Sequence, residues 1–186
     1  EEVSGYNAKI GWGVAVFDIP IDQLFAAMNE EEKHTGLTPI SYTKIVSGTA
    51  CEDGRKVLML LPLSLISDRW WVIIYSTNPN IRSKSDGLVA ELSWVGEPNK
   101  NNFTLDPVSQ QKVSGDTVFV NFTQGAWFLI RLDENHTLGE YYNWADPGGN
   151  IPAGPASTFA ASSIEDTIMA MDRYAKTGNL QCSYQW

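Results

Sequence analysis

Residues 162–177 constrain the fold most, because they form the longest stretch of the chain with the pattern of an amphipathic helix. Ser162 can cap its start, since Glu165 follows three residues later as a capping box requires. Gly178 can end it in the left-handed conformation. One helical face carries an apolar stripe of Ile164, Ile168, Met171 and Ala175. A single striped helix is not stable in water, so the rest of the chain must supply an apolar surface.

Most of the remaining chain has the alternation typical of short β-strands. The candidates are residues 8–17, 41–50, 55–62, 70–77, 88–95, 117–123, 126–132 and 137–145. The links between them are short, which favours antiparallel pairing. Pro20 can open a helix after the first strand, and the acidic stretch 30–34 adds a further turn. We therefore expect one α+β domain over residues 1–186, with about eight strands, two short helices after the first strand, and 179–186 as a C-terminal tail.

Two segments depart from simple alternation of polar and apolar residues. In the first strand, Gly11, Gly13 and Ala15 alternate with larger apolar residues, which indicates that another element packs closely on the small face. Residues 96–116 are polar, rich in Asn, Pro and Gly, and lack periodicity. A loop of that length is often functional, so we expect a functional rim or a mobile flap there.

The composition excludes several classes of partner. The 186 residues carry a net charge of −9, whereas nucleic acids and anionic membrane surfaces require a basic patch. The sequence has no apolar run long enough to cross a membrane as a helix. The chain suits a soluble globular domain with a sizeable core.

Catalytic and metal-binding patterns are not found. The two histidines, His34 and His136, have no neighbouring pattern of a Ser- or Cys-based triad. No Gly-rich phosphate loop precedes a helix, and no spacing of His, Asp and Glu marks a metal site. We therefore predict no catalytic residues, no metal and no cofactor.

Cys51 and Cys182 form neither a zinc site nor a CxxC motif. They pair if the compartment is oxidising, and otherwise they are two inert thiols. The chain begins at Glu1 without Met, which indicates a processed form or a trimmed piece. Together with the acidity, these features favour an exported protein, periplasmic or secreted, with a cytoplasmic protein as the alternative.

A twisted antiparallel sheet curls around a helix packed on one face, and a helix held above that sheet leaves an internal pocket. Four pieces of sequence add a resemblance: LPLS at 61–64 before SDRWWV at 67–72, GAW at 125–127, the strand 137–146 with its turn DPGGNIP at 146–152, and the closing helix. In this order they resemble the START domain, within the Bet v 1-like (SRPBCC) helix-grip group. The resemblance implies a curved antiparallel sheet wrapped around the long C-terminal helix. It also implies a tunnel for one lipid or other hydrophobic molecule beneath that helix.

The match predicts that Trp71, Ile73 and Tyr75 face the tunnel. Tyr75 stands where sterol-type members often carry an arginine paired to an acid, and no matching buried ion pair is evident in this sequence. A phenol still offers one hydrogen bond to a ligand. The further candidate lining residues are Trp94, Trp127, Tyr142, Trp144, Ile164, Ile168 and Met171, the last three as the ceiling.

Two assignments stay open at this point. Tyr142 and Trp144 share one face of the last strand, Tyr141 and Asn143 share the other, and periodicity does not identify the inner face. Arg131 is a candidate pocket cation for a carboxylate or phosphate head group, with a solvated strand end as the alternative.

The predicted function is binding and transfer of a lipid or other hydrophobic small molecule by a monomer, with transient contact to a membrane. One alternative is an enzyme similar to the polyketide cyclases and aromatases of the helix-grip group, in which Tyr75, Tyr142 and Arg131 orient the substrate. The other is a ligand-gated module, in which filling of the pocket fixes the helix and loops for a protein partner.

Overall fold

The computed structural model describes residues 9–63, 66–148 and 153–184, with the backbone alone for Lys9 and residues 153–162. The elements in chain order are β1 (Lys9–Phe17), α1 (Ile21–Met28), η1 (Glu31–His34), β2 (Tyr42–Ser47), β3 (Lys56–Leu61), β4 (Asp68–Thr77), α2 (Pro79–Lys84), β5 (Val89–Gly96), η2 (Lys100–Asn102), α3 (Pro107–Lys112), β6 (Thr117–Phe119), β7 (Phe122–Arg131), β8 (Thr137–Asp146) and α4 (Ala153–Lys176). The predicted α+β fold with an eight-stranded sheet and a long C-terminal helix is confirmed.

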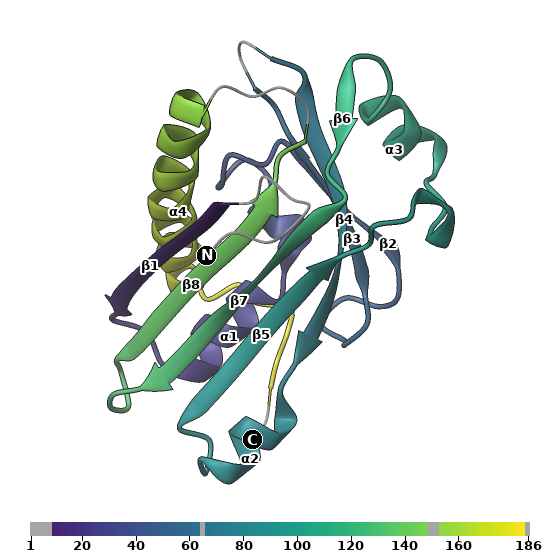
Figure 1. Ribbon diagram of the computed structural model, residues 1–186. Helices are drawn as coiled ribbons and strands as arrows, with labels where there is room; N and C mark the ends of the chain where they lie inside the picture. The colour runs from purple at the N-terminus through teal and green to yellow at the C-terminus, as the bar shows by residue number, and fades with distance from the viewer. Residues whose placement is uncertain (1–8, 64–65, 149–152, 185–186) are drawn as a thin grey trace.

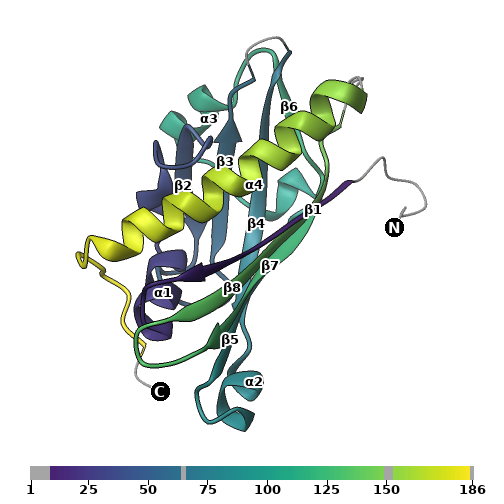
Figure 2. The same cartoon turned by 90° about the vertical axis from the view of Figure 1, so that its left-hand side faces the viewer.

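The sheet has the strand order β1-β8-β7-β5-β4-β3-β2, and each neighbouring pair on this path is antiparallel. The short β6 pairs with β4 in parallel. The sheet curves around α1 and α4, and α4 crosses its concave side diagonally (Figures 1 and 2). The main core lies between these helices and the sheet, where apolar side chains such as Phe17, Leu24, Phe25, Leu92, Leu129 and Met171 are buried.

The small face of β1 is where α4 packs. A Cβ atom on Gly13 would lie 2.8 Å from Cγ2 of Ile164 and 2.9 Å from Cδ1 of Ile168. Only a glycine therefore lets the helix approach the edge strand this closely. The close packing predicted from the alternation of small residues is confirmed, and Ile10, Trp12, Val14 and Val16 are exposed on the convex side.

The polar segment after β5 is packed on the sheet and is not an open flap, while the functional rim stays a prediction. It folds over the convex side of the sheet, where Phe103, Leu105, Val113 and Phe119 pack on a second core of Leu58, Leu60, Trp70 and Val72. Its α3 begins at Asp106, whose carboxylate accepts hydrogen bonds from the amides of Val108 and Ser109 at 2.9 and 3.0 Å. The prediction failed because a few widely spaced apolar residues are enough to fix a segment that has no periodicity.

Three boundaries differ from the sequence prediction. The helix α4 begins at Ala153, so Ser162 lies inside it and cannot cap its start. The added part is rich in alanine, which favours a helix without any apolar stripe. The predicted strand 117–123 is divided between β6 and β7, which pair with different strands. A short helix, α2, was missed, although Asn78 caps it by accepting a hydrogen bond from the Ile81 amide at 3.2 Å.

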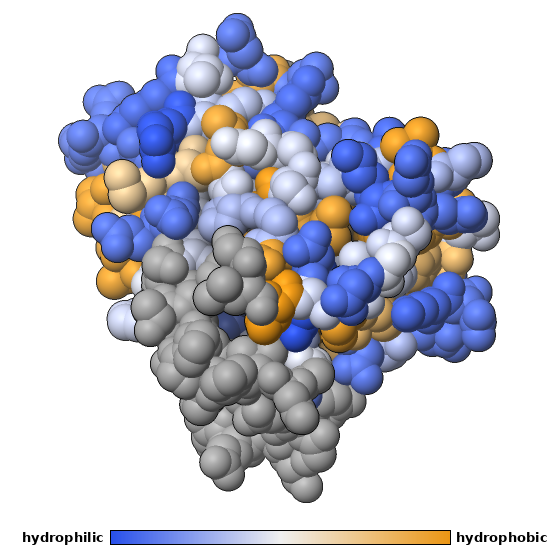
Figure 3. Space-filling model, turned by 90° about the horizontal axis from the view of Figure 1, so that it is seen from above, coloured by the Kyte–Doolittle hydropathy of each residue, from blue (hydrophilic) through white to orange (hydrophobic). Residues whose placement is uncertain are grey.

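Seen from above, the described surface shows hydrophobic residues in small separate patches among hydrophilic ones (Figure 3). Within the described residues, no helix has both the length and the apolar character that a membrane crossing requires.

Candidate functional site

A cavity of about 160 Å³ lies between α4 and the concave side of the sheet. The strands β2 to β5, β7 and β8 supply its floor and walls, and α4 supplies Ser163, Thr167 and Met171. The chain around η1 closes one end with Met28, His34 and residues 38–40. The site is therefore built from nearly the whole chain, and it exists only when the sheet is fully formed.

Aromatic side chains form a continuous belt in this cavity. The ring centroids of Tyr75 and Trp94 are 6.0 Å apart, those of Trp94 and Tyr141 are 5.7 Å apart, and those of Tyr141 and Trp127 are 4.5 Å apart. Gly125 makes this possible, because a Cβ there would lie 2.3 Å from the Trp94 ring. The indole of Trp94 on β5 thus reaches across β7 to Tyr141 on β8. The belt presents flat apolar surface to the cavity.

Three hydroxyl groups of the lining have no hydrogen-bond partner among the described residues: those of Thr43, Tyr75 and Tyr141. Burial, and next the charge of Glu31, raise the pKa of the Tyr75 hydroxyl well above its ordinary value. Burial also raises the pKa of Tyr141. Both phenols are therefore neutral at physiological pH and can donate a hydrogen bond to a ligand.

A buried ion pair lies behind Tyr75. The guanidinium of Arg55 donates to both carboxylate oxygens of Glu31, to Oδ1 of Asn29 at 3.0 Å and to the carbonyl of Glu52 at 2.8 Å. It also lies 4.6 Å from the centroid of the Tyr75 ring. The sequence analysis did not predict this ion pair. Neither charged group lines the cavity, so it is not the tunnel pair of the sterol-type members.

The electrostatics of this pair follow from its burial. Burial raises the pKa of the Glu31 carboxyl, and the hydrogen bonds and charge of Arg55 oppose that change. Burial works to lower the pKa of Arg55, but the hydrogen bonds and charge of Glu31 outweigh it, and the pKa is raised. The cation is thus held by its own partners and is not available to a ligand.

His34 lines the cavity as a neutral side chain. Its Nε2 lies 2.8 Å from the carbonyl of Ala27, and because a carbonyl can only accept, Nε2 carries the proton. Burial lowers the pKa of His34 to about 4, more than the Ala27 carbonyl and the charge of Glu30 raise it. The imidazole therefore adds no charge to the cavity at neutral pH.

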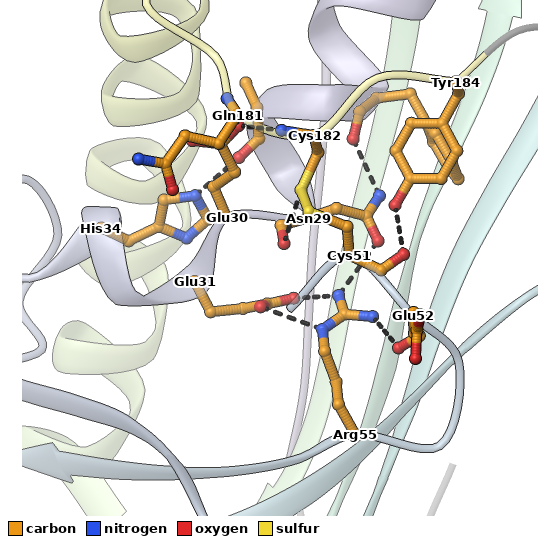
Figure 4. Close-up of a disulfide and its surroundings, with 12 residues drawn as sticks. Asn29, Glu30, Glu31, His34, Cys51, Glu52, Arg55, Gln181, Cys182 and Tyr184 are labelled. Carbon is orange, nitrogen blue, oxygen red and sulfur yellow. Dashed lines mark hydrogen bonds and ion pairs between the residues drawn. A yellow bond between two sulfur atoms is a disulfide. The ribbon is translucent and has the colours of Figure 1, made fainter. Parts of the chain in front are cut away.

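The C-terminal tail is fastened next to this ion pair by a disulfide between Cys51 and Cys182 (Figure 4). Of the two alternatives that the sequence left open, the paired form is observed. Glu30 accepts hydrogen bonds from the amides of Gln181 and Cys182, and the Tyr184 hydroxyl donates to the carbonyl of Cys51 at 2.9 Å. The tail is thereby joined to the end of α1 and to the turn between β2 and β3.

Several predicted site residues do lie on the cavity. Its lining includes Trp71, Ile73, Tyr75, Trp94, Trp127 and Met171. Ile164 and Ile168 come from the same helix, but they pack against Gly13 of β1 and are outside the lining.

Two of the predicted lining residues were placed on the wrong face of β8. Tyr142 is 37% exposed, and the ring of Trp144 packs edge-on against Phe122 at 5.5 Å, both on the convex side. Tyr141 and Asn143 line the cavity instead. The two faces of a strand differ by one residue, and alternation alone does not distinguish them.

Arg131 is not a cavity cation. It shares a strand face with Trp127, but it lies beyond Leu129 at the end of β7, where its Nη2 is 3.4 Å from Asp22. Glu91 does not pair with it and accepts a hydrogen bond from Asn78 at 2.7 Å. Arg131 therefore belongs to a surface ion pair near α1.

Sequence reasoning missed a further group of lining residues. They come from several parts of the chain, and many of them are polar: Met28, His34, Thr38, Pro39, Ile40, Thr43, Met59, Leu61, Thr123, Ser163 and Thr167. Alternation along the strands 41–50 and 55–62 was the available signal for Thr43, Met59 and Leu61, once one face is known to be inner. The described residues contain no group of three or more His, Cys, Asp or Glu side chains placed to hold a metal ion.

No protein-family model matches the chain, and no curated protein matches it in sequence. Solved structures match it in fold. The STAR-related lipid transfer protein of Xanthomonas axonopodis superposes with a TM-score of 0.72 at 16% identity, covering 94% of this chain and 90% of that chain. Human StAR-related lipid transfer protein 5 superposes with a TM-score of 0.67 at 13% identity, covering 95% of this chain and 89% of that chain. The Zhui aromatase/cyclase of a Streptomyces species superposes with a TM-score of 0.56 at 12% identity, covering 91% of this chain and 94% of that chain. The chain therefore has the START-type helix-grip fold.

Proposed function

We propose that this protein binds and transfers one lipid or other hydrophobic small molecule in the cavity beneath α4. The observation that carries the proposal is an aromatic cavity between the sheet and the closing helix, with a few unpaired hydroxyl groups. Mostly apolar cavities with a small number of placed polar groups are typical of ligand sites. The similarity in fold to two lipid transfer proteins supports the same reading.

The size of the cavity limits what it holds without rearrangement. Ligand sites usually measure about 300–1,000 Å³, whereas this cavity measures about 160 Å³. An engineered cavity of roughly 150 Å³ takes up benzene. The cavity therefore fits one ring or a short piece of chain, and a whole lipid requires α4 to move away from the sheet.

The C-terminal end of α4 is fixed, which restricts such a movement. The side-chain amide of Gln23 donates to the carbonyl of Ala175 at 2.7 Å, and the hydroxyl of Tyr174 donates to Glu30. The disulfide holds the tail that follows. Movement that enlarges the cavity is therefore expected nearer to Ser163 and Thr167 than to the anchored end.

Burial of apolar surface drives binding in this proposal. Each Å² of apolar area removed from water contributes roughly 25 cal/mol, before the cost of ordering the ligand and the roof. We propose that the protein acts as a monomer, touches a membrane transiently, and works in an oxidising compartment to which it is exported, because the disulfide needs such conditions to persist.

A vesicle assay tests this function. Donor vesicles of phosphatidylcholine with a fluorescent lipid are mixed with unlabelled acceptor vesicles, and the transfer rate is measured with and without the protein. We expect acceleration that Met171→Gln reduces, because Met171 lines the cavity and is buried. Met169→Gln is the matched control, since Met169 is 48% exposed on the same helix. Equal rates for the two variants would argue against transfer through the cavity.

The enzyme alternative has one observation in its favour, namely two neutral tyrosine hydroxyls, Tyr75 and Tyr141, facing a cavity in a fold shared with an aromatase/cyclase. A positioned phenol can exchange a proton with a substrate. Mass spectrometry of the bound molecule after prolonged incubation separates the two functions, because a carrier returns its ligand chemically unchanged.

A further inference from the structure

We infer that the cavity selects electrically neutral ring compounds that carry a hydroxyl or carbonyl group, and rejects carboxylates of the same size. This inference rests on the proposed function, because it specifies the class of molecule that the same cavity takes. It follows from the charges, the unpaired hydroxyls and the shape of the lining.

The first observation is that the lining carries no charge. Every described residue that lines the cavity has an apolar or an uncharged polar side chain, and His34 is neutral. The nearest buried cation, Arg55, is behind the Tyr75 ring and already donates to Glu31, Asn29 and the backbone. A carboxylate in the cavity would lose its water and gain no cation, which is strongly unfavourable.

The residue that sequence reasoning assigned to an anionic head group is also unavailable. Arg131 lies outside the cavity and pairs with Asp22. Arg69, which shares a strand face with Trp71, donates to the carbonyls of Ser67, Pro147 and Gly148 and is not part of the lining. Arg131 and Arg69 are thus both engaged outside the cavity.

The second observation is that hydrogen-bond donors in the lining are unused. The hydroxyls of Tyr75 and Tyr141 have no partner among the described residues, and that of Thr43 is buried and equally unpaired. Tyr75 and Tyr141 line the cavity, so a ligand oxygen that accepts a hydrogen bond from either phenol gains affinity. Donors with uncharged surroundings favour a carbonyl or hydroxyl oxygen.

The third observation concerns shape. The volume of about 160 Å³ fits a single ring, and the belt formed by Tyr75, Trp94, Tyr141 and Trp127 offers edges and faces for aromatic contacts. Aromatic pairs prefer such tilted or offset arrangements. A ring compound therefore uses the belt, while a saturated chain of equal area gains only from burial.

The experiment compares three probes that share one methylated ring: toluene, p-cresol and p-toluate, which is ionised at neutral pH. Affinities come from titrations followed by ¹H–¹⁵N NMR, in which the indole signals of Trp71, Trp94 and Trp127 report on the cavity. We expect p-cresol to bind about 3- to 10-fold more tightly than toluene, as one net hydrogen bond allows. We expect p-toluate to bind at least about 100-fold more weakly than p-cresol, because its charge is left without a partner.

Variants assign the preference to the hydroxyls. The double variant Tyr75→Phe/Tyr141→Phe keeps both rings, and it should bind p-cresol no more tightly than toluene. Tyr42→Phe is the control, because its hydroxyl bonds to Ser109 on the convex side and the preference should not change. Thermal melting of each variant shows that it is folded.

The possible outcomes separate this inference from the proposed function. Binding of toluene together with equal or tighter binding of p-toluate would overturn the selection for neutral compounds and leave a hydrophobic site standing. Equal binding of p-cresol and toluene in the unmodified protein would instead overturn the preference for a hydroxyl or carbonyl group. Binding of none of the three probes would contradict both the ring-sized cavity and the inference built on it.

Discussion

Acid should destabilise this protein through His34, and the effect can be estimated from the structure. Burial lowers the pKa of this imidazole from 6.5 to about 4, so the unfolded chain binds the proton more readily than the folded one. The stability contributed by the neutral ring is present above pH 6.5 and is lost as the pH falls from 6.5 towards 4. At pH 4.5 the loss attributable to His34 is about 2–3 kcal/mol.

The assay is urea unfolding at several pH values between about 7.5 and 4.5, with the free energy of unfolding extrapolated to water. Other groups also titrate in this range, so the control is His34→Gln. A glutamine amide can also donate to the Ala27 carbonyl, but it does not titrate. The difference between the two proteins should grow by about 2–3 kcal/mol across the range. A constant difference would refute the assignment of a histidine that is neutral in the folded protein.

Three further predictions concern the packing around the cavity. Arg55→Met leaves Glu31 buried without its partner and should cost about 3–5 kcal/mol in unfolding experiments, most of which Arg55→Met combined with Glu31→Leu should restore. If the double variant is as unstable as the single one, the pair is not an independent unit. Cys51→Ser removes a crosslink between residues 131 apart and should lower the free energy of unfolding by about 4–5 kcal/mol in the chain-entropy account. Adding a reductant to this variant should cause no further loss of stability. A reductant that leaves the unmodified protein equally stable would contradict this. Gly13→Val places a side chain where α4 packs, and it should lower the free energy of unfolding by about 1–3 kcal/mol or more, seen as a lower melting temperature. An unchanged melting temperature would show that α4 is not held at β1.

Much of the fold was predictable because strand alternation and helical periodicity are local signals. The antiparallel strands and the closing helix followed from short links, turn residues and the resemblance carried by DPGGNIP. The inward positions of Trp71, Ile73 and Tyr75 followed from one matched motif, and the structure places all three on the cavity.

The rest depended on contacts between distant residues. The inner face of β8 is fixed by the pairing of Tyr141 with Gly13, which alternation within residues 137–145 cannot reveal. The ion pair of Arg55 with Glu31 joins two segments 24 residues apart, and neither residue has a local signal of burial. Residues 97–116 resemble a loop because what fixes them is the convex face of the sheet, not their own pattern.

The central claim is that the cavity beneath α4 holds a hydrophobic molecule, and native mass spectrometry of the protein purified from its own cells tests it most directly. The account predicts an additional mass that matches a lipid or a smaller apolar compound, that dissociates in organic solvent, and that is reduced in Met171→Gln but not in Met169→Gln. A single species at the mass of the bare chain, which also takes up no added fluorescent lipid and no ring compound, would contradict it.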